Sequence, residues 1–91
     1  MDYTIQTNQK EILIENASKN LNSKVVDQLV ALRKEKSMTQ QDVAEATGIN
    51  RANVARIERK KHTSSLEVLV KYANAVGKEL DIILVDPREE C

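Results

Sequence analysis

Only two glycines and one proline interrupt this chain of 91 residues, and this scarcity of turn-forming residues limits the folds it can adopt. A β-sandwich needs a turn about every 8–12 residues, so the sequence favours helices joined by short connections. Hydrophobic residues make up 41% of the chain, and the aromatic residues are two tyrosines. We therefore expect a mainly helical domain with an aliphatic core.

The length and the charge pattern limit the possible functions. A chain of 91 residues allows one small domain and excludes a large enzyme. The net charge is zero, but residues 23–65 carry nine basic and five acidic side chains, a net charge of +4. Residues 66–91 carry three basic and six acidic side chains, a net charge of −3. A basic centre suits a surface that faces phosphate groups.

Residues that commonly carry catalysis or bind metals are scarce. Cys91 is the one cysteine and His62 the one histidine, so neither a cysteine-based metal site nor a histidine relay is expected. The sequence contains no glycine-rich phosphate loop and no apolar run of the roughly 18 residues that a bilayer requires. We predict a cytoplasmic protein that is not an enzyme and uses no metal or cofactor.

Apolar residues at helical spacing predict where the helices lie. In the N-terminal arm, residues 1–22, Ile14, Ala17 and Leu21 would share one helix face; an arm that orders only on contact is the alternative. Stronger patterns predict helices over 23–36, 39–47, 50–60 and 65–76.

The C-terminal region, residues 79–91, combines a β-branched apolar stretch with an acidic tail. The stretch predicts a short β-strand, which needs a partner for its backbone groups. That partner is either residues 3–7 of the same chain or the same strand of a second copy. We assign dimerisation to Leu80, Ile82, Ile83, Leu84 and Val85, and the competing dimer patch is Leu66, Leu69 and the end of the fourth predicted helix.

Two short predicted helices meet at a sharp turn in the centre of the domain, residues 23–78. Ala44 permits close approach of the helices, Gly48 permits the turn, and Ile49 and Val54 bury the second helix against the first. This is the layout of a helix-turn-helix, whose second helix enters the major groove of DNA.

Specific residues at these positions indicate a family. The segments Met38-Thr39-Gln40-Gln41-Asp42-Val43-Ala44 and Gly48-Ile49-Asn50-Arg51-Ala52-Asn53-Val54-Ala55-Arg56-Ile57-Glu58 resemble the Cro/cI-type helix-turn-helix family, also called XRE. The resemblance covers about residues 24–77. It implies a four- to five-helix repressor-like domain that binds double-stranded DNA, followed here by the predicted C-terminal strand.

The resemblance also implies roles for individual residues. Gln40 would contact a phosphate and steady the third helix, while Arg51, Ala52 and Arg56 would face the groove, with Asn53 beside them. Either arginine has the chemistry to bind guanine or phosphate, and Ala52 can contact a thymine methyl group. The remaining DNA-contact candidates are Thr39, Asn50, Arg59, Lys60 and Lys61.

Two further features follow from the resemblance. Arg33 and Glu58 occupy the places of a structural ion pair in the family. The family usually carries glycine near Lys60, and this departure puts the geometry of the loop after the third helix in question.

The overall layout is similar to the HigA-like antitoxins, which are paired with RelE-like toxins. A monomer would offer only one recognition helix, so we expect a homodimer that binds a palindromic operator. The antitoxin likeness adds that the protein represses its own operon and covers a toxin with its acidic tail and with Ile12, Leu13 and Ile14. A stand-alone repressor without a toxin partner is the alternative.

Overall fold

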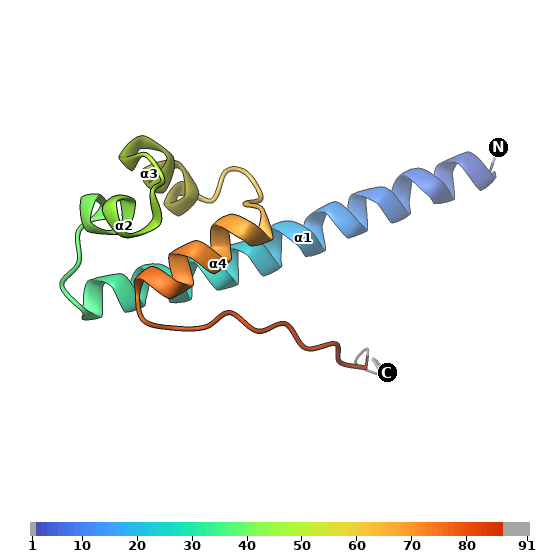
Figure 1. Cartoon of the computed structure of the whole chain (residues 1–91). Coiled ribbons are helices and arrows are strands. Elements are labelled where there is room, and N and C mark those ends of the chain that lie inside the picture. Colours follow the sequence, from blue (N-terminus) through green and yellow to red (C-terminus); the bar gives the residue numbers. More distant parts are fainter. Residues whose placement is uncertain (1, 87–91) are drawn as a thin grey trace.

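In the computed structural model the backbone is described for residues 2–86, and the side chains from residue 13 onward. This part of the chain forms four helices and contains no β-strand. The helices are α1 (Asp2–Glu35), α2 (Gln40–Thr47), α3 (Arg51–Arg59) and α4 (Leu66–Ala75) (Figure 1). The prediction of a mainly helical domain is therefore confirmed.

Helix α1 runs without a break through the position where the sequence suggested a separate arm. No glycine or proline occurs in its 34 residues, so nothing forces the backbone to leave the helix at residue 22. At about 1.5 Å per residue the helix is about 51 Å long, and the molecule's longest dimension is 52 Å. The N-terminal half extends well beyond the other helices (Figure 1). Its described side chains, residues 13–21, are exposed.

Side-chain caps and left-handed residues set the limits of the short helices. The Thr39 hydroxyl accepts a hydrogen bond from the Asp42 amide, and the Asp42 carboxylate accepts one from the Thr39 amide. This capping box satisfies amides that the first turn of α2 leaves free. Gly48 ends α2 at a φ of 75°, which glycine adopts without a Cβ clash. Asn50 caps α3 by accepting a hydrogen bond from the Ala52 amide, and Ser65 caps α4 by accepting one from the Val68 amide.

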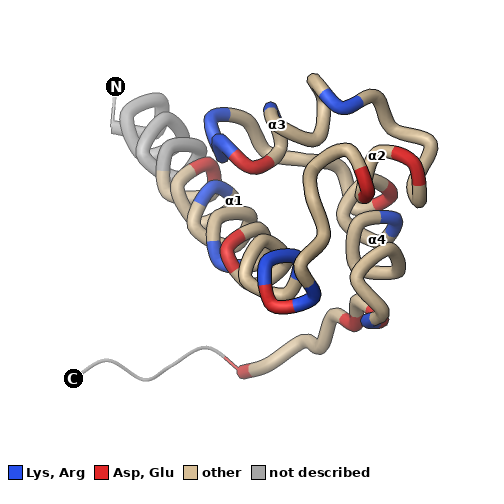
Figure 2. The backbone as a smooth tube through the Cα atoms, turned by 90° about the vertical axis from the view of Figure 1, so that its left-hand side faces the viewer, with Lys and Arg blue, Asp and Glu red and all other residues tan. Residues whose placement is uncertain are grey.

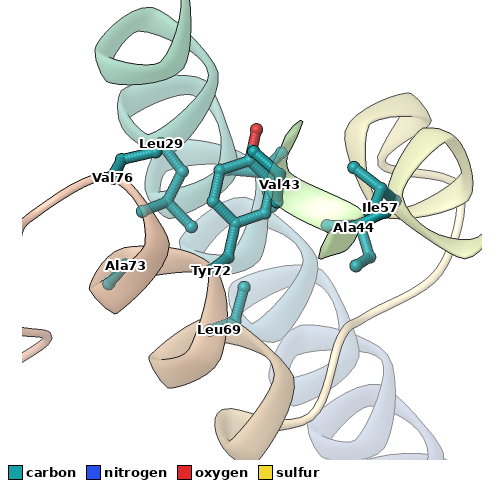
Figure 3. Packing of buried hydrophobic residues seen from close by; sticks show 10 residues of the cluster. Leu29, Val43, Ala44, Ile57, Leu69, Tyr72, Ala73 and Val76 are labelled. Atoms are coloured by element: carbon teal, nitrogen blue, oxygen red, sulfur yellow. The ribbon is translucent and has the colours of Figure 1, made fainter. Parts of the chain in front are cut away.

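All four helices contribute to one aliphatic core (Figure 3). Val26 and Leu29 come from the C-terminal half of α1, which is the part that the other helices cover. The remaining buried residues are Val43, Ala44, Val54, Ile57, Leu69, Tyr72, Ala73 and Val76. Burial of each large aliphatic side chain stabilises the fold by roughly 1.5–3 kcal/mol. This core holds α2 and α3 at a fixed angle to one another.

The prediction of a C-terminal β-strand is wrong, because residues 78–86 contain no strand. Residues 78–86 are extended and cross beneath α4 without strand pairing (Figure 1). The physical reason is the lack of a partner: residues 3–7, the proposed partner in the chain, belong to α1. Leu80 packs against the core, but Ile82, Ile83, Leu84 and Val85 are 62–95% exposed. Cys91 and the rest of the acidic tail after Asp86 lie outside the described residues.

Candidate nucleic-acid interface

Helix α3 is packed on one side and open on the other. Val54 and Ile57 are buried against the core, and they lie three residues apart on one face of the helix. The opposite face carries Arg51, Ala52, Asn53, Arg56 and Arg59, all of which are exposed. A helix of nine residues thus presents an exposed face that carries three arginines and that nothing in the described chain covers.

The charge on that open face has one sign. Helix α3 contains three arginines and one acidic residue, Glu58, which points inward to Arg33. The positive end of the helix dipole lies at the N-terminus, beside Arg51. Figure 2 shows the positions of the basic and acidic residues along the backbone, including the acidic residues of the C-terminal segment. The exposed face of α3 therefore suits an anionic partner.

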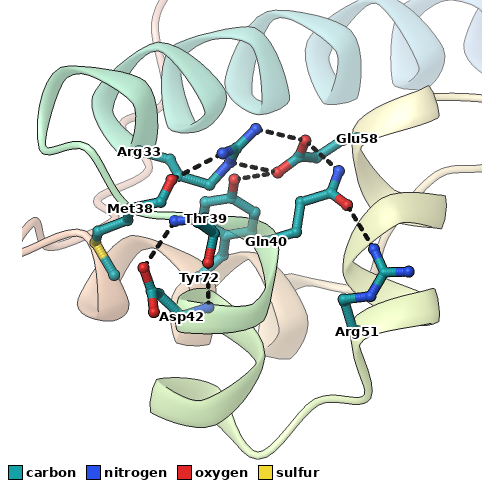
Figure 4. A network of polar contacts seen from close by, with 8 residues as sticks. All are labelled: Arg33, Met38, Thr39, Gln40, Asp42, Arg51, Glu58 and Tyr72. Carbon is teal, nitrogen blue, oxygen red and sulfur yellow. Dashed lines mark hydrogen bonds and ion pairs between the residues drawn. The ribbon is translucent and has the colours of Figure 1, made fainter.

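Glu58 is the centre of a buried polar network that joins three other helices to α3 (Figure 4). Its Oε2 accepts hydrogen bonds from Arg33 Nε at 2.9 Å and from the Tyr72 hydroxyl at 2.6 Å. Its Oε1 accepts from Arg33 Nη2 at 3.1 Å and from Gln40 Nε2 at 3.0 Å. We call Arg33, Gln40, Glu58 and Tyr72 the Glu58 network.

Burial and hydrogen bonding shift the ionisation of this network. Burial by itself would raise the pKa of Glu58, but hydrogen bonds from Tyr72, Gln40 and Arg33, with the Arg33 charge, lower that pKa below its ordinary value. Burial and the hydrogen bond to Glu58 raise the pKa of Tyr72 well above its usual range. Burial would lower the pKa of Arg33, but the bond and the charge of Glu58 raise it. At neutral pH the ion pair is fully charged and Tyr72 is protonated.

Gln40 links the network to the exposed face of α3. Its amide nitrogen donates to Glu58, and its amide oxygen accepts from Arg51 Nη1 at 3.4 Å. Asn50, next to Arg51, uses its side-chain oxygen to cap the helix at the Ala52 amide, 2.8 Å away. The first turn of α3 is thus fixed by two contacts, one from Gln40 to Arg51 and one from Asn50 to the Ala52 amide.

The end of α3 has an unusual backbone conformation. Lys60 has a φ of 61°, in the left-handed region, near the place where the family that this sequence resembles usually carries glycine. Its ammonium group lies 2.6 Å from the Asp27 carboxylate of α1, so this candidate DNA contact is paired within the chain. Arg59 and Lys61, on either side of it, are exposed. Lysine therefore tolerates the turn at a conformational cost of about 1–2 kcal/mol.

Comparison with known proteins identifies the architecture. The model of the helix-turn-helix family matches residues 29–83, well over half of the chain. The chain belongs to the Cro/cI-type helix-turn-helix family. Members of this family are DNA-binding regulators.

Curated relatives of two kinds are similar to this chain. Antitoxin HigA1 of Mycobacterium tuberculosis, from strains CDC 1551 / Oshkosh and ATCC 25618 / H37Rv, is 33% identical over 64 residues. That alignment covers 70% of this chain and 43% of HigA1. The immunity repressor protein of Bacillus phage phi105 is 35% identical over 60 residues, covering 66% of this chain and 42% of the phage protein. The chain therefore spans less than half the length of these relatives. No solved structure gives a significant match.

The candidate DNA contacts of this Cro/cI-type domain lie at two places. Thr39 and Gln40 lie at the start of α2, and the others lie on α3 or directly around it. An open groove of about 550 Å³ runs along α3 and is lined by Asn50, Asn53, Arg56 and the loop at His62–Ser64. Gln40 contacts Arg51, so the start of α2 lies beside the start of α3, whereas Lys60 faces Asp27 of α1.

Sequence reasoning missed two buried polar residues of this site. Tyr72, which received no role from the sequence, is fully buried and donates to Glu58. Asn22 of α1 accepts from the Ser64 amide at 3.0 Å and donates to the His62 carbonyl at 3.4 Å. A tyrosine on a buried helix face is a usable signal, because its hydroxyl needs a partner. No comparable signal distinguishes Asn22 from the other asparagines.

Two kinds of feature are absent from the described residues. None of the helices within residues 2–86 has both the length and the apolar character that a membrane span needs. Over the same range, no three histidine, cysteine or acidic residues gather where they could hold a metal ion.

Proposed function

We propose that this chain is a sequence-specific transcriptional regulator that binds operator DNA with α3 in the major groove. The observation that carries the proposal is the exposed, positively charged face of α3, held by the Glu58 network on its other side. A helix of this width fits the major groove, and a helix fixed in this way loses little entropy on binding.

The exposed residues divide by chemistry. Arg51 and Arg56 can each donate two hydrogen bonds to guanine or hold a phosphate, and Ala52 can contact a thymine methyl group. Asn53 lies beside these residues. Contacts with the DNA backbone are assigned to Thr39, Gln40, Asn50, Arg59 and Lys61, whereas Lys60 is left out because its ammonium group pairs with Asp27. These contacts would position the protein without selecting a sequence.

We propose that the regulator binds as a homodimer. A single α3 offers one short recognition surface, whereas two copies about 34 Å apart contact successive major grooves of a palindrome. The candidate dimer residues Leu80 and Ile82 line an apolar groove of about 440 Å³ together with Leu66 and Leu69, the competing patch. The two patches therefore adjoin at this groove, where Leu69 is buried, and the exposed Ile83, Leu84 and Val85 follow Ile82 in the chain.

We further infer that the protein represses its own operon and neutralises a RelE-like toxin. The similarity to antitoxin HigA1 supports this proposal. The acidic tail and the exposed Leu13 and Ile14 of α1, with Ile12, are the proposed toxin-facing elements. The similarity to the phage immunity repressor favours a second candidate, a stand-alone repressor with no toxin partner.

A mobility-shift titration with DNA from upstream of the gene tests the DNA proposal. Arg51→Ala combined with Arg56→Ala should weaken binding about thirtyfold or more, since each two-bond guanine contact contributes about 1–3 kcal/mol. Lys71→Ala combined with Lys78→Ala is the matched control, because it removes two positive charges from exposed sites outside α3. Equal losses in both double variants would mean that only overall charge matters. Unchanged binding in the arginine variant would refute the proposal.

Co-expression with the product of a small basic reading frame beside the gene tests the antitoxin proposal. We expect co-purification and rescue of growth, and we expect the double arginine variant to rescue growth while failing to bind DNA. Absence of such a reading frame, or of any complex, would leave the stand-alone repressor as the better description.

A further inference from the structure

A chain of hydrogen bonds runs from the core of the domain to the first residue of α3. It passes from Tyr72 of α4 to Glu58, then to Gln40 of α2, and ends at Arg51 (Figure 4). We propose that Glu58 and Tyr72 are positioning residues for Arg51, and that they set operator specificity without touching DNA. The inference rests on the proposed DNA-binding function of Arg51.

The first step concerns the Glu58 carboxylate, which has no freedom to rotate. Each of its oxygens accepts two hydrogen bonds, and the four donors come from Arg33, Gln40 and Tyr72. Its side chain is 10% exposed, so water does not compete strongly for these bonds. The carboxylate is therefore a fixed acceptor for the Gln40 amide.

The second step concerns the orientation of that amide. An ionised carboxylate only accepts hydrogen bonds and a guanidinium only donates them. Gln40 lies between the two, so its nitrogen must face Glu58 and its oxygen must face Arg51. The opposite orientation would place donor against donor and acceptor against acceptor. Glu58 thus determines that Gln40 presents an acceptor to α3.

The third step concerns Arg51. The acceptor on Gln40 engages Nη1 at 3.4 Å, a long and exposed contact, which leaves the other guanidinium donors free for DNA. This contact favours a subset of Arg51 side-chain conformers before DNA is bound, so Arg51 loses less conformational entropy on binding. No hydrogen bond between described residues joins Arg56 to this chain, so Arg56 is an internal control.

Nitrogen NMR of the free protein tests the positioning directly. Tyr72→Phe keeps the ring and removes one donor to Glu58, and Gln40→Ala removes the link without altering the core. We expect both variants to shift the guanidinium signals of Arg51 and to leave those of Arg56 unchanged. An unchanged Arg51 signal in Gln40→Ala would overturn the proposal whether or not the protein binds DNA.

A double-mutant cycle tests its use in DNA recognition. With Arg51 present, Tyr72→Phe should weaken operator binding about threefold to tenfold, and in the Arg51→Ala background by less than about 1.5-fold. In the Arg56→Ala background the effect of Tyr72→Phe should persist. Operators altered one base pair at a time should lose discrimination at the same position in Tyr72→Phe as in Arg51→Ala.

The outcomes separate this inference from the function on which it rests. Wild-type protein that binds no operator would refute the DNA-binding proposal, and the NMR result would still decide whether Glu58 orders Arg51. If the protein binds its operator specifically but Tyr72→Phe has the same effect with Arg51 present and with Arg51→Ala, then Tyr72 has a structural role alone. That result would overturn the positioning role. Where Tyr72→Phe lowers the folded fraction, Gln40→Ala repeats the cycle, and only the part of its effect that depends on Arg51 is compared, because Gln40 is itself a candidate phosphate contact.

Discussion

Replacing Glu58 by glutamine tests how much more a buried ion pair stabilises this domain than an exposed one does. The change keeps the shape of the side chain and removes its charge. Arg33 and Glu58 have side chains that are 11% and 10% exposed, so the lost charge leaves the guanidinium without its counter-ion in a nearly dry site. The matched control is Asp27→Asn, which makes the same chemical change in a pair whose side chains are 33% and 64% exposed.

The structure allows an estimate of both effects. Breaking a buried pair costs about 3–5 kcal/mol. Arg33 also donates to the Met38 carbonyl at 2.9 Å and the new amide oxygen can still accept, but the amide nitrogen replaces an oxygen that accepts from two donors, so about 3 kcal/mol is the minimum that we expect. For a domain of this size that loss lowers Tm by about 12–24 °C. Asp27→Asn should cost at most about 1 kcal/mol.

Thermal and urea unfolding followed by far-ultraviolet circular dichroism would measure both variants. In 1 M salt the screening length falls to about 3 Å, so the small effect of Asp27→Asn should vanish while that of Glu58→Gln remains. Equal free energies of unfolding for the two variants, within about 1 kcal/mol, would refute the argument from burial.

The other predictions concern pH and the two left-handed caps. Because the folded pKa of Glu58 lies below its ordinary value of 4.5, its stabilisation is present above that pH and is lost as the pH falls through the folded pKa. The pKa of Tyr72 is raised, so its contribution is present below its ordinary value of 10.0 and is lost as the pH rises towards the folded pKa. The free energy of unfolding, measured against pH, should therefore be constant between these limits. In Glu58→Gln its decrease at acid pH should be smaller, and a free energy that peaks at one pH would contradict this. Gly48→Ala should cost about 1–2 kcal/mol, purely from its positive φ, because a Cβ there would meet nothing within 4 Å. Lys60→Gly should raise the free energy of unfolding by about 0.5–1 kcal/mol, since relief of the left-handed strain exceeds the loss of an exposed ion pair. Lys60→Ala keeps the strain and should lower that free energy, and the same sign for both changes would refute the strain argument.

Much of the fold was predictable because its signals are local. Thr39, Gly48 and Asn50 mark the ends of α2 and α3 through the chemistry of a few neighbouring residues. Val54 and Ile57 mark the inner face of α3 by their spacing, which leaves Arg51 and Arg56 on the outer face. The C-terminal segment was not predictable in this way, since a β-branched stretch becomes a strand only where another strand is present to pair with it.

Local sequence patterns were sufficient to predict the three short helices with their ends, the inward and outward faces of α3, and the family, but not the start of α1 at Asp2. These properties depend on residues within one or two turns of each other, so spacing and capping chemistry are sufficient. Only the tertiary structure decided that Tyr72 of α4 donates to Glu58, that Gln40 faces both Glu58 and Arg51, and that Lys60 pairs with Asp27. Those contacts join residues 11 to 33 positions apart. Their formation depends on how the packed helices cross, and hydrogen bonding acts only over the short distances that this packing creates.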